Sequence, residues 1–600
     1  MPNAADILVE TLIDWEVKVI FGLPGDGING IMEALRKRQD EIAFVQVRHE
    51  ESAAFMACAY AKFTGRLGVC LATSGPGGTH LLTGLYDAKL DQMPVLAITG
   101  MQYHDLIATF TQQDVDLTRV FDNVAIYNAQ VSDAAHMENL ASLACRSALA
   151  RRGVAHLSIA SDTQEMEAKS RSKRNRPKHV PNRYFKGRQV PDDAELDRAA
   201  KVLNAAEKVA ILAGRGALGA HEELRETAAL LAAPVAKALL GKAVLADDDF
   251  HSTGGIGILG TAPSQMIMEE CDAVLIVGST FPYIEYYPRP EAARGVQIDS
   301  DPQRIGLRFP VDAGLVGDAK DTLRLLNSRL ERKSDHSFLE QTRSAMDDWR
   351  RKLEMMETDQ ATPMKAPAVV RAFGRRITQD GILVTDSGQN TELAARHIDV
   401  GTGNQFAVSG ALASMASGLP YAIAAGIAYP GRPLYAVVGD GGLGMQLGEF
   451  STAVRHGLPL KLLVICNGML NQIAWEQMMF LGNPQFACEL APIDFAKAAE
   501  AMGGRGFSIR RFDEIESVLD QAFSTDGAVI IQAFVDKYEP MMPPKMPKDY
   551  TKNFRKALPE TQGHEAIEAN IARPPLRDMM EARQAELEIS ETTADLPGIP

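Results

Sequence analysis

Short apolar runs alternate with helical stretches along most of this chain. Between Val19 and Gly100, four runs have the composition of buried strands, VIFG, AFVQV, LGVCLAT and PVLAIT. The segments between them include Glu50 to Thr64, which has helical composition and is followed by Gly65. Strands that alternate with helices are typical of a parallel sheet covered by helices. The first part of the chain is therefore predicted to be an α/β domain.

The same pattern returns twice further along the chain. A second series of strand-like runs is VAILAG (209–214), PVAKALL (234–240), AVLIVG (273–278) and GVQID (295–299). A third series is GILVTDSG (381–388), LYAVVGDGG (434–442), LKLLVICNG (460–468) and AVIIQAF (528–534). We therefore predict three doubly wound parallel-sheet α/β domains, at 1–168, 192–329 and 366–543.

Two stretches without this pattern separate the predicted domains. Residues 169–191 are basic and contain prolines, and residues 330–365 are strongly charged, so both are predicted to be linkers. The chain after Pro543 is polar and has no clear periodicity. We predict that 544–600 form an irregular tail that lies on the surface.

Composition narrows the possible partners. The chain has 600 residues, and no apolar run approaches the roughly 18 residues of a membrane span. Its formal charge of -15 argues against nucleic-acid binding, which needs a positive surface. The six cysteines are scattered, and the N-terminus has no basic segment followed by an apolar one, so a cytoplasmic location is expected. Small molecules are the expected partners.

A glycine turn in the third series carries the first candidate chemistry. In YAVVGDGGLGMQL (435–447), an apolar strand ends at Gly439, Asp440, Gly441 and Gly442, and a helical pattern follows. Such a turn presents backbone N–H groups to anions such as a diphosphate. Asp440 would repel a diphosphate unless a cation lay between them, and Mg²⁺ prefers oxygen ligands. Asn467, at the end of the next strand, could complete that site, although Gly-Asp-Gly can also be a simple turn.

The pairing of Asp440 with Asn467 resembles the signature of the thiamine-diphosphate-dependent enzymes, and the resemblance extends over 6–543. It implies a Mg²⁺ ion bound by Asp440, Asn467 and the backbone carbonyl of Met469, with thiamine diphosphate bound through this metal. The first domain would then hold the pyrimidine ring and the third the diphosphate. Cys466 stands where the family usually has a first asparagine.

The resemblance also selects a catalytic carboxylate in VRHEESAAFMACAYAKFTG (47–65). Acidic residues in a first helical turn usually complement the helix dipole. Glu50, however, matches the glutamate that activates the cofactor in this family by binding its aminopyrimidine ring. Met415 matches the apolar residue that bends the cofactor, and Gln389 and Asn390 match diphosphate contacts.

Three stretches of the second series resemble the FAD-binding segments of pyruvate oxidases and of the quinone-dependent pyruvate dehydrogenase. They are STGGIGILGTAPS, GSTFPYIEYYP and VQIDSDPQRIG. By this match Asp299 binds the adenosine ribose, Thr280 and Phe281 lie near the flavin, and three residues lie along FAD: Gly257, Ile258 and Leu259. The alternative is a degenerate domain that binds ADP or nothing.

Within the family, His80 and Glu476 match the pyruvate oxidases, because acetohydroxyacid synthases have asparagine and tryptophan at these positions. Gln113 matches an active-site glutamine common to both groups. Gln112 and Gln472 instead stand where the oxidases have phenylalanine, which makes the expected pocket more polar. A more polar substrate, a slower electron transfer and a carboligation outcome all remain open.

The resemblance thus implies a flavoenzyme that decarboxylates a 2-oxo acid, pyruvate, and oxidises the hydroxyethyl adduct on thiamine diphosphate through FAD. The electron acceptor would be oxygen or a quinone, and the enzyme a homodimer or homotetramer. One alternative is a carboligase of the acetolactate synthase type with structural FAD. A catalytically silent homologue is disfavoured by the retention of Glu50, Asp440 and Asn467. The acidic segment 562–600 lacks a basic amphipathic face, so membrane attachment is not expected.

Overall fold

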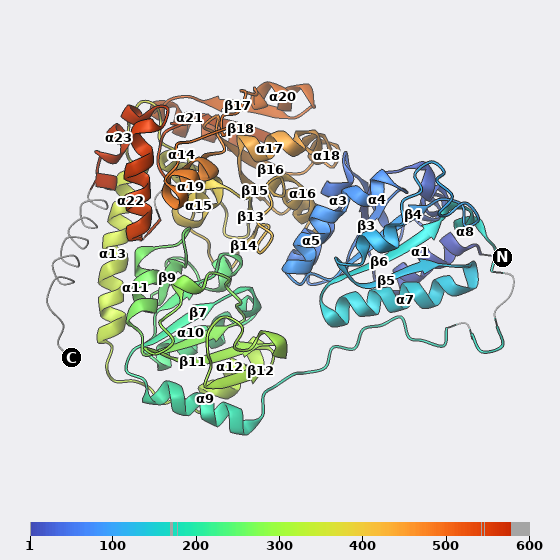
Figure 1. Ribbon diagram of the computed structural model, residues 1–600, viewed down its shortest axis with the longest axis horizontal. Coiled ribbons are helices and arrows are strands. Elements are labelled where there is room, and N and C mark those ends of the chain that lie inside the picture. Colours follow the sequence, from blue (N-terminus) through green and yellow to red (C-terminus); the bar gives the residue numbers. More distant parts are fainter. Residues whose placement is uncertain (1, 169–171, 177, 542, 545–546, 578–600) are drawn as a thin grey trace.

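The computed structural model describes residues 2–168, 172–176, 178–541, 543–544 and 547–577. It contains three sheets of six strands, all paired in parallel, with helices on both faces of each sheet (Figure 1). The prediction of three α/β domains is therefore confirmed. In Figure 1 the N-terminal domain lies at the right, the central domain at the lower left and the C-terminal domain above it.

The N-terminal sheet has the strand order β2-β1-β3-β4-β6-β5. Its strands are β1 (Val19–Gly22), β2 (Ala43–Gln46), β3 (Gly68–Ala72), β4 (Val95–Met101), β5 (Ala125–Val131) and β6 (Val154–Ala160). Its helices are α1 (Ala4–Asp14), α2 (Asn29–Lys37), α3 (Glu50–Thr64), α4 (Pro76–His80), α5 (Leu82–Leu90), α6 (Leu117–Phe121), α7 (Ala134–Arg151) and α8 (Ser161–Glu165). Helix α3 ends as expected at Gly65, whose φ of 68° is favourable for glycine.

The central sheet has the order β12-β11-β10-β7-β8-β9. Its strands are β7 (Val209–Ala213), β8 (Val235–Lys237), β9 (Ser252–Gly255), β10 (Ala273–Val277), β11 (Arg294–Asp299) and β12 (Ala313–Val316). Its helices are α9 (Asp193–Ala205), α10 (His221–Leu230), α11 (Ala262–Glu270) and α12 (Ala319–Asn327). The strand expected over 234–240 is shorter than predicted, because the chain turns into a 3-10 helix at Leu239–Val244.

The C-terminal sheet has the order β14-β13-β15-β16-β18-β17. Its strands are β13 (Ile382–Thr385), β14 (Gln405–Ala407), β15 (Leu434–Gly439), β16 (Leu460–Cys466), β17 (Arg505–Ile509) and β18 (Val529–Phe534). Its helices are α14 (Ala366–Gly374), α15 (Gln389–His397), α16 (Gly418–Ala428), α17 (Asp440–Gln446), α18 (Phe450–Arg455), α19 (Asn471–Leu481), α20 (Phe495–Ala501) and α21 (Ile515–Ser524).

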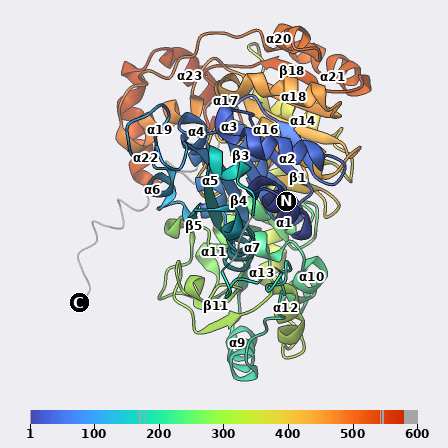
Figure 2. The ribbon, with the colours of Figure 1, turned by 90° about the vertical axis from the view of Figure 1, so that its right-hand side faces the viewer.

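The first and third domains share one apolar layer. Helices α3 and α16 pack against each other between the two sheets, and Figure 2 shows them side by side. Phe55 and Tyr421 meet edge to face there, with ring centroids 6.5 Å apart. Lys62 is buried in the same layer and donates to Asp91 at 2.6 Å and to the carbonyl of Val408 at 2.9 Å. The two domains of one chain are thus joined by apolar packing and by the hydrogen bond from the buried Lys62 ammonium group to the carbonyl of Val408.

Two segments outside the sheets are more ordered than the sequence suggested. Residues 330–365, predicted to be a linker, contain the 21-residue helix α13 (Ser337–Glu357), which runs from the central to the C-terminal domain in Figure 1. The tail was predicted to be irregular, and this is wrong for its first part, which forms α22 (Lys548–Ala557) and α23 (His564–Ile571). The remaining tail, 578–600, lies outside the described residues.

The tail helices escaped prediction because only a narrow stripe of α22 is apolar or buried. Thr551, Phe554 and Ala557 are buried at helical spacing, Tyr550 is half-buried beside them, and the other residues of α22 are charged or asparagine. Phe554 packs on Trp475 of α19, with ring centroids 5.9 Å apart. The tail therefore covers the outer face of α19.

None of the helices in the described part of the chain is long and apolar enough to cross a membrane.

Candidate functional site

The turn at the end of β15 forms one end of a cavity. Asp440 begins α17, and its carboxylate accepts hydrogen bonds from the N–H of Gly441 at 2.9 Å and of Gly468 at 2.8 Å. Gly468 follows β16, the neighbouring parallel strand, so Asp440 ties the ends of two strands together. Burial raises the pKa of Asp440, and no cationic side chain of the described residues pairs with it. A cation bound at this carboxylate would offset that burial cost.

The other two predicted metal ligands lie in the loop after β16. The side-chain oxygen of Asn467 accepts a hydrogen bond from the N–H of Met469 at 3.0 Å, and its amide donates to Gln389 at 3.1 Å. Asp440, Asn467 and Met469 all line the cavity. A carboxylate, an amide and a backbone carbonyl are oxygen donors of the kind that Mg²⁺ prefers. The residues present therefore fit this ion.

A buried carboxylate that sequence reasoning missed, that of Asp386, lies between Gly442 and the residues that follow Met415. Asp386 follows β13 and accepts hydrogen bonds from the N–H groups of Ala416 at 3.0 Å and Ser417 at 3.1 Å. Burial raises its pKa to about 6. A side chain at Gly442 would bring a Cβ within 1.9 Å of Asp386, so this position requires glycine. The available signal was an aspartate directly after an apolar strand in GILVTDSG.

One cavity of about 1310 Å³ brings most of the predicted cofactor residues together. From the C-terminal domain it is lined by Gln389, Asn390, Met415, Gly439, Asp440, Gly441, Gly442, Asn467, Met469 and Gln472. Asn390 also has a local role, because its amide donates to the carbonyl of Asp386 at 2.7 Å and to Thr385 at 3.1 Å.

The central domain lines the same cavity with every residue predicted to bind FAD, namely Gly257, Ile258, Leu259, Thr280, Phe281 and Asp299. Gly257 has a φ of 90°, and a Cβ there would lie 2.8 Å from the ring of Phe281. Thr280 accepts a hydrogen bond from Arg304 at 2.8 Å. Asp299 ends β11, and burial raises its pKa. The cavity thus runs from the Asp440 turn to the ends of the central strands.

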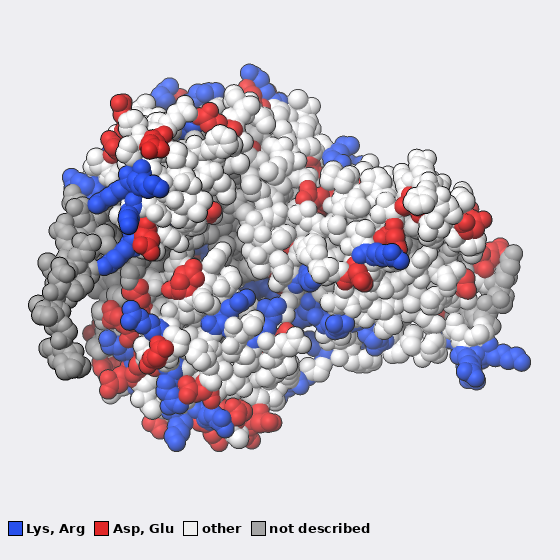
Figure 3. All heavy atoms as spheres, in the orientation of Figure 1, with Lys and Arg blue, Asp and Glu red and all other residues white. Residues whose placement is uncertain are grey.

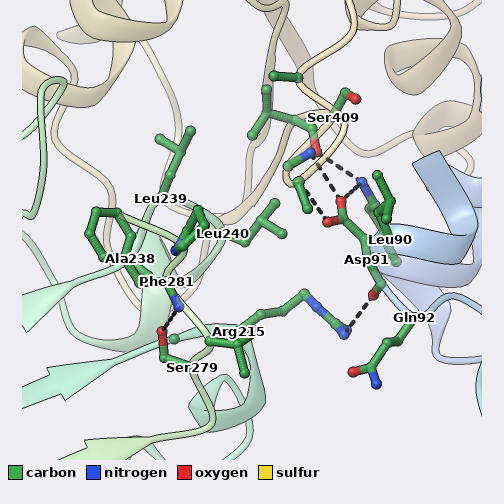
Figure 4. A pocket seen from close by; sticks show the side chains of 18 of the residues that line it. Leu90, Asp91, Gln92, Arg215, Ala238, Leu239, Leu240, Ser279, Phe281 and Ser409 are labelled. Atoms are coloured by element: carbon green, nitrogen blue, oxygen red, sulfur yellow. Dashed lines mark hydrogen bonds and ion pairs between the residues drawn. The ribbon is translucent and has the colours of Figure 1, made fainter. Parts of the chain in front are cut away.

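Arginines that the sequence did not single out also line this cavity. Arg152, Arg215 and Arg304 come from two domains, and Figure 3 shows Lys and Arg side chains gathered along the hollow between them. Arg215 crosses from the central domain and donates to the carbonyl of Asp91 at 3.0 Å (Figure 4). Burial lowers its pKa to about 10. Guanidinium groups that line a cavity suit the phosphates of a nucleotide cofactor.

Helix α15 joins the two halves of the cavity. It begins at Gln389, and near its end Arg396 donates to the carbonyls of Gly260 at 2.8 Å and Ile258 at 2.9 Å. The segment predicted to lie along FAD is therefore held by the same helix that begins with the predicted diphosphate contacts.

The predicted catalytic residues of the N-terminal domain form a separate group. Glu50 is 6% exposed at the start of α3, and its carboxylate lies 3.0 Å from the Nδ1 atom of His80. The ring of His80 stacks on that of His49, with centroids 4.5 Å apart. Gln113 accepts a hydrogen bond from Ser74. Within one chain, Glu50, His80 and Gln113 are not among the described residues that line the cavity.

The two glutamines that depart from the oxidase pattern lie apart. Gln472 lines the cavity and donates to Glu476 at 2.9 Å across one turn of α19. Gln112 is exposed, lies outside the cavity lining and accepts a hydrogen bond from Gln102 through its carbonyl. Of this pair, only Gln472 could contact a ligand in the cavity of its own chain.

Family comparisons agree with this geometry. Three family models match in order: the N-terminal TPP binding domain of thiamine pyrophosphate enzymes over residues 2–120, the central domain over 196–326 and the C-terminal TPP binding domain over 386–533. The chain belongs to the thiamine pyrophosphate enzymes. Thiamine pyrophosphate is another name for thiamine diphosphate, so the predicted family is confirmed.

Relatives of this thiamine pyrophosphate enzyme include proteins of both expected types. It is 38% identical to YdaP of Bacillus subtilis (strain 168), described as a thiamine pyrophosphate-containing protein, over 93% of this chain and 95% of YdaP. It is 31% identical to the pyruvate oxidase of Lactiplantibacillus plantarum over 91% and 90% of the two chains. It is 30% identical to a probable acetolactate synthase large subunit of Methanocaldococcus jannaschii over 90% and 94%. The protein is thus a thiamine pyrophosphate-dependent enzyme related to both groups.

Proposed function

We propose that this enzyme catalyses the oxidative decarboxylation of a 2-oxo acid, pyruvate, with thiamine pyrophosphate, Mg²⁺ and FAD. The observation that carries the proposal is the single cavity that joins the Asp440 turn to Thr280, Phe281 and Asp299. A cavity lined by both residue sets could hold the two cofactors next to each other. The overall reaction converts pyruvate and water to acetate, CO₂, two protons and two electrons, which pass to FAD and then to oxygen or a quinone.

In this proposal the two cofactors supply the bond cleavage and the electron sink. Asp440, Asn467 and Met469 would hold the Mg²⁺ ion, and Met415 would support the bend of the thiamine cofactor. Glu50 would exchange a proton with the aminopyrimidine ring from its buried position. His80 lies within hydrogen-bond distance of Glu50 and could position or protonate the substrate.

A second candidate is a carboligase of the acetolactate synthase type, in which FAD has only a structural role. Two observations favour it. Gln472 places an amide in the cavity where the oxidases have an aromatic ring, and the amide is bound to Glu476. The relatives also include acetolactate synthases.

Anaerobic addition of pyruvate to the holoenzyme separates the two candidates. The flavin spectrum and the products are recorded together, with Glu50→Gln as the inactive control. Rapid bleaching of the flavin with release of acetate supports the oxidase. Unbleached flavin with accumulation of acetolactate supports the carboligase and contradicts the oxidase. If pyruvate gives neither product, a panel of hydroxylated and acidic 2-oxo acids tests the substrate.

We further propose that the active site is completed by a second copy of the chain. The Glu50 group and the Asp440 cavity are separate in one chain, and both domains expose large apolar side chains, with Phe110 at 101% and Phe486 at 79%. A second copy of the chain could cover these exposed side chains in the assembly. A homodimer or homotetramer is expected by light scattering.

Mixing two inactive variants tests this arrangement directly. If each site takes Glu50 from one copy and Asp440 from another, co-refolded Glu50→Gln and Asp440→Ala chains should regain about one quarter of the wild-type sites, as random C2 pairing requires. Absence of any regained turnover in a mixture shown to contain mixed dimers would contradict the shared site.

A further inference from the structure

The backbone just before Glu50 is held by a carboxylate of the C-terminal domain, that of Glu449. Glu449 lies in the 3-10 helix Leu447–Glu449, directly after α17. Its Oε1 atom accepts hydrogen bonds from the N–H of Arg48 at 2.6 Å and from the N–H of His49 at 3.1 Å. These are the two residues that precede Glu50, and His49 is the N-cap of α3. Glu449 therefore binds the main chain directly before Glu50.

The carboxylate of Glu449 is fully buried, which costs free energy. It is 0% exposed, and burial raises its pKa, while the hydrogen bonds from Arg48, Thr452 and His49 act against that shift. Thr452 donates to its second oxygen at 2.9 Å. In the described part of the chain no cationic group pairs with it. A buried carboxylate without a cation costs free energy unless N–H and O–H groups donate hydrogen bonds to it. The bonds from Arg48, His49 and Thr452 therefore explain how this carboxylate can be buried here.

The surrounding contacts show what Glu449 adds. The two domains are already joined nearby by side chains, because Arg48 donates to Ser451 at 2.9 Å and Arg455 donates to Gln46 at 2.5 Å. These exposed pairs can hold the surfaces together without fixing the main chain. Glu449 alone of this group binds consecutive backbone N–H groups next to Glu50.

We propose that Glu449 is a positioning residue for Glu50: its carboxylate fixes the backbone of Arg48 and His49 and so sets the direction of the Glu50 side chain. The inference rests on the proposed role of Glu50. Its neighbour Gln446 strengthens the same clamp, because it accepts from Ser52 at 2.7 Å and donates to Glu51 at 2.7 Å. The segment from Asp440 to Glu449 thus carries a proposed metal ligand at its start and the clamp on the N-terminal domain at its end.

The first test needs no cofactor. Amide hydrogen exchange is measured on the full-length protein for wild type, Glu449→Ala, Glu449→Gln and the matched control Ser451→Ala, which loses only the contact to the Arg48 side chain. In Glu449→Ala the amides of Arg48 and His49 should exchange about tenfold faster or more, as expected for loss of a hydrogen bond to a charged group. Glu449→Gln retains the size and one acceptor oxygen, so a smaller increase is expected. Unchanged exchange would overturn the clamp.

The second test asks whether the clamp matters for Glu50. With Mg²⁺ and thiamine pyrophosphate bound, exchange of the cofactor C2 proton is followed by NMR, and cofactor affinity by calorimetry. We expect Glu449→Ala to slow C2 exchange about tenfold while cofactor affinity changes much less. Glu449→Gln should slow C2 exchange by a smaller factor. Ser451→Ala should leave both the exchange rate and the affinity unchanged. If Glu449→Ala does not fold, the same comparison is made with Glu449→Gln.

The two proposals fail in different ways. If Glu50→Gln slows C2 exchange and Glu449→Ala frees the two amides but leaves C2 exchange unchanged, the positioning role is wrong. If Glu50→Gln itself leaves C2 exchange unchanged, the proposed role of Glu50 is wrong, and with it the positioning of Glu50, whereas the clamp is still judged by amide exchange.

Discussion

Gln472 donates a hydrogen bond to Glu476 at 2.9 Å across one turn of α19. The pair places a polar side chain in the cavity and engages the carboxylate that resembles that of the oxidases. Because the amide of Gln472 is partly buried, this bond supplies a partner for it and stabilises the polar lining. It also makes Gln472 the first residue to vary when the outcome of the reaction is examined.

Gln472→Phe is expected to increase the rate of flavin reduction and, if the wild type forms acetolactate, to shift its products toward acetate. The substitution removes the bond to Glu476 and makes the cavity wall apolar. Stopped-flow absorbance under anaerobic conditions, with product analysis, measures both effects. Gln112→Phe is the comparison, because Gln112 lies outside the cavity of its own chain. Unchanged reduction rate and product ratio in Gln472→Phe would show that this amide does not control the outcome.

Asp440→Ala is expected to abolish retention of thiamine pyrophosphate, because the diphosphate loses its bridging cation. Calorimetric titration with the cofactor and Mg²⁺ measures this directly, and wild-type protein treated with a chelator should behave in the same way until Mg²⁺ is restored. Asp526→Ala, at an exposed turn before β18, is the control. Tight binding of thiamine pyrophosphate by Asp440→Ala would contradict the assignment of Asp440 as a metal ligand.

Glu50→Gln is expected to bind the cofactor but to exchange its C2 proton about 10² to 10⁴ times more slowly, the usual contribution of a general acid or base. An amide cannot exchange a proton with the aminopyrimidine ring as the carboxylate does. Glu10→Gln, at an exposed glutamate of α1, is the control for the same substitution away from the site. Near-normal exchange in Glu50→Gln would move this role to another residue.

Asp386 should make stability depend on pH. Its pKa is about 6 in the folded protein, against about 3.9 for an unfolded aspartate, so the folded state binds the proton more tightly. The stability that this proton supplies is complete below the unfolded pKa and is lost as pH rises through 6, by about 3 kcal/mol at most.

The measurement compares thermal unfolding of wild type and Asp386→Asn without cofactor, between about pH 4 and about pH 7. Asparagine does not titrate, so the unfolding midpoint of wild type should fall relative to that of the variant as pH rises. A constant difference across this range would show that Asp386 titrates normally.

Phe554→Ala is expected to lower the free energy of unfolding by about 3 to 5 kcal/mol, as for other buried phenylalanines. Phe554 is 3% exposed and packs on Trp475, so its loss leaves a cavity behind α19. Calorimetric unfolding and faster amide exchange in α19 would report the effect. Phe185→Ala, at a side chain that is 64% exposed, should change neither. Equal unfolding midpoints for Phe554→Ala and Phe185→Ala would mean that the packing of the tail on α19 does not stabilise the protein.

The sequence predicted the inner strands of the sheets better than the outer ones. The strands it missed were β5, β9, β12, β14 and β17, which all lie at sheet edges, and the inner strand β6. Edge strands have one partner and are partly exposed, so their composition is less apolar, as the segment Gln405–Ala407 illustrates. The missed β6 is fully buried, and its His156 and Ser158 interrupt the apolar run.

The candidate site was predictable where one local motif carries the chemistry. Asp440 and Asn467 follow adjacent strands, and the structure brings them into one loop cluster. Glu449 and Asp386 were missed because their partners, His49 and Ala416, are distant in sequence, and no local pattern marks such pairs. Arg215 was missed for the same reason, because its partner Asp91 lies in another domain.

The contacts of Arg396 limit how this enzyme can be rebuilt from parts. Its guanidinium group belongs to the C-terminal domain but holds the carbonyls of Ile258 and Gly260 in the central domain. The central domain is therefore not an interchangeable module. A chimera that takes its central domain from another protein must keep the 257–260 loop in a shape that Arg396 can bind. Otherwise it must take α15, the helix that carries Arg396, from the same protein as the loop.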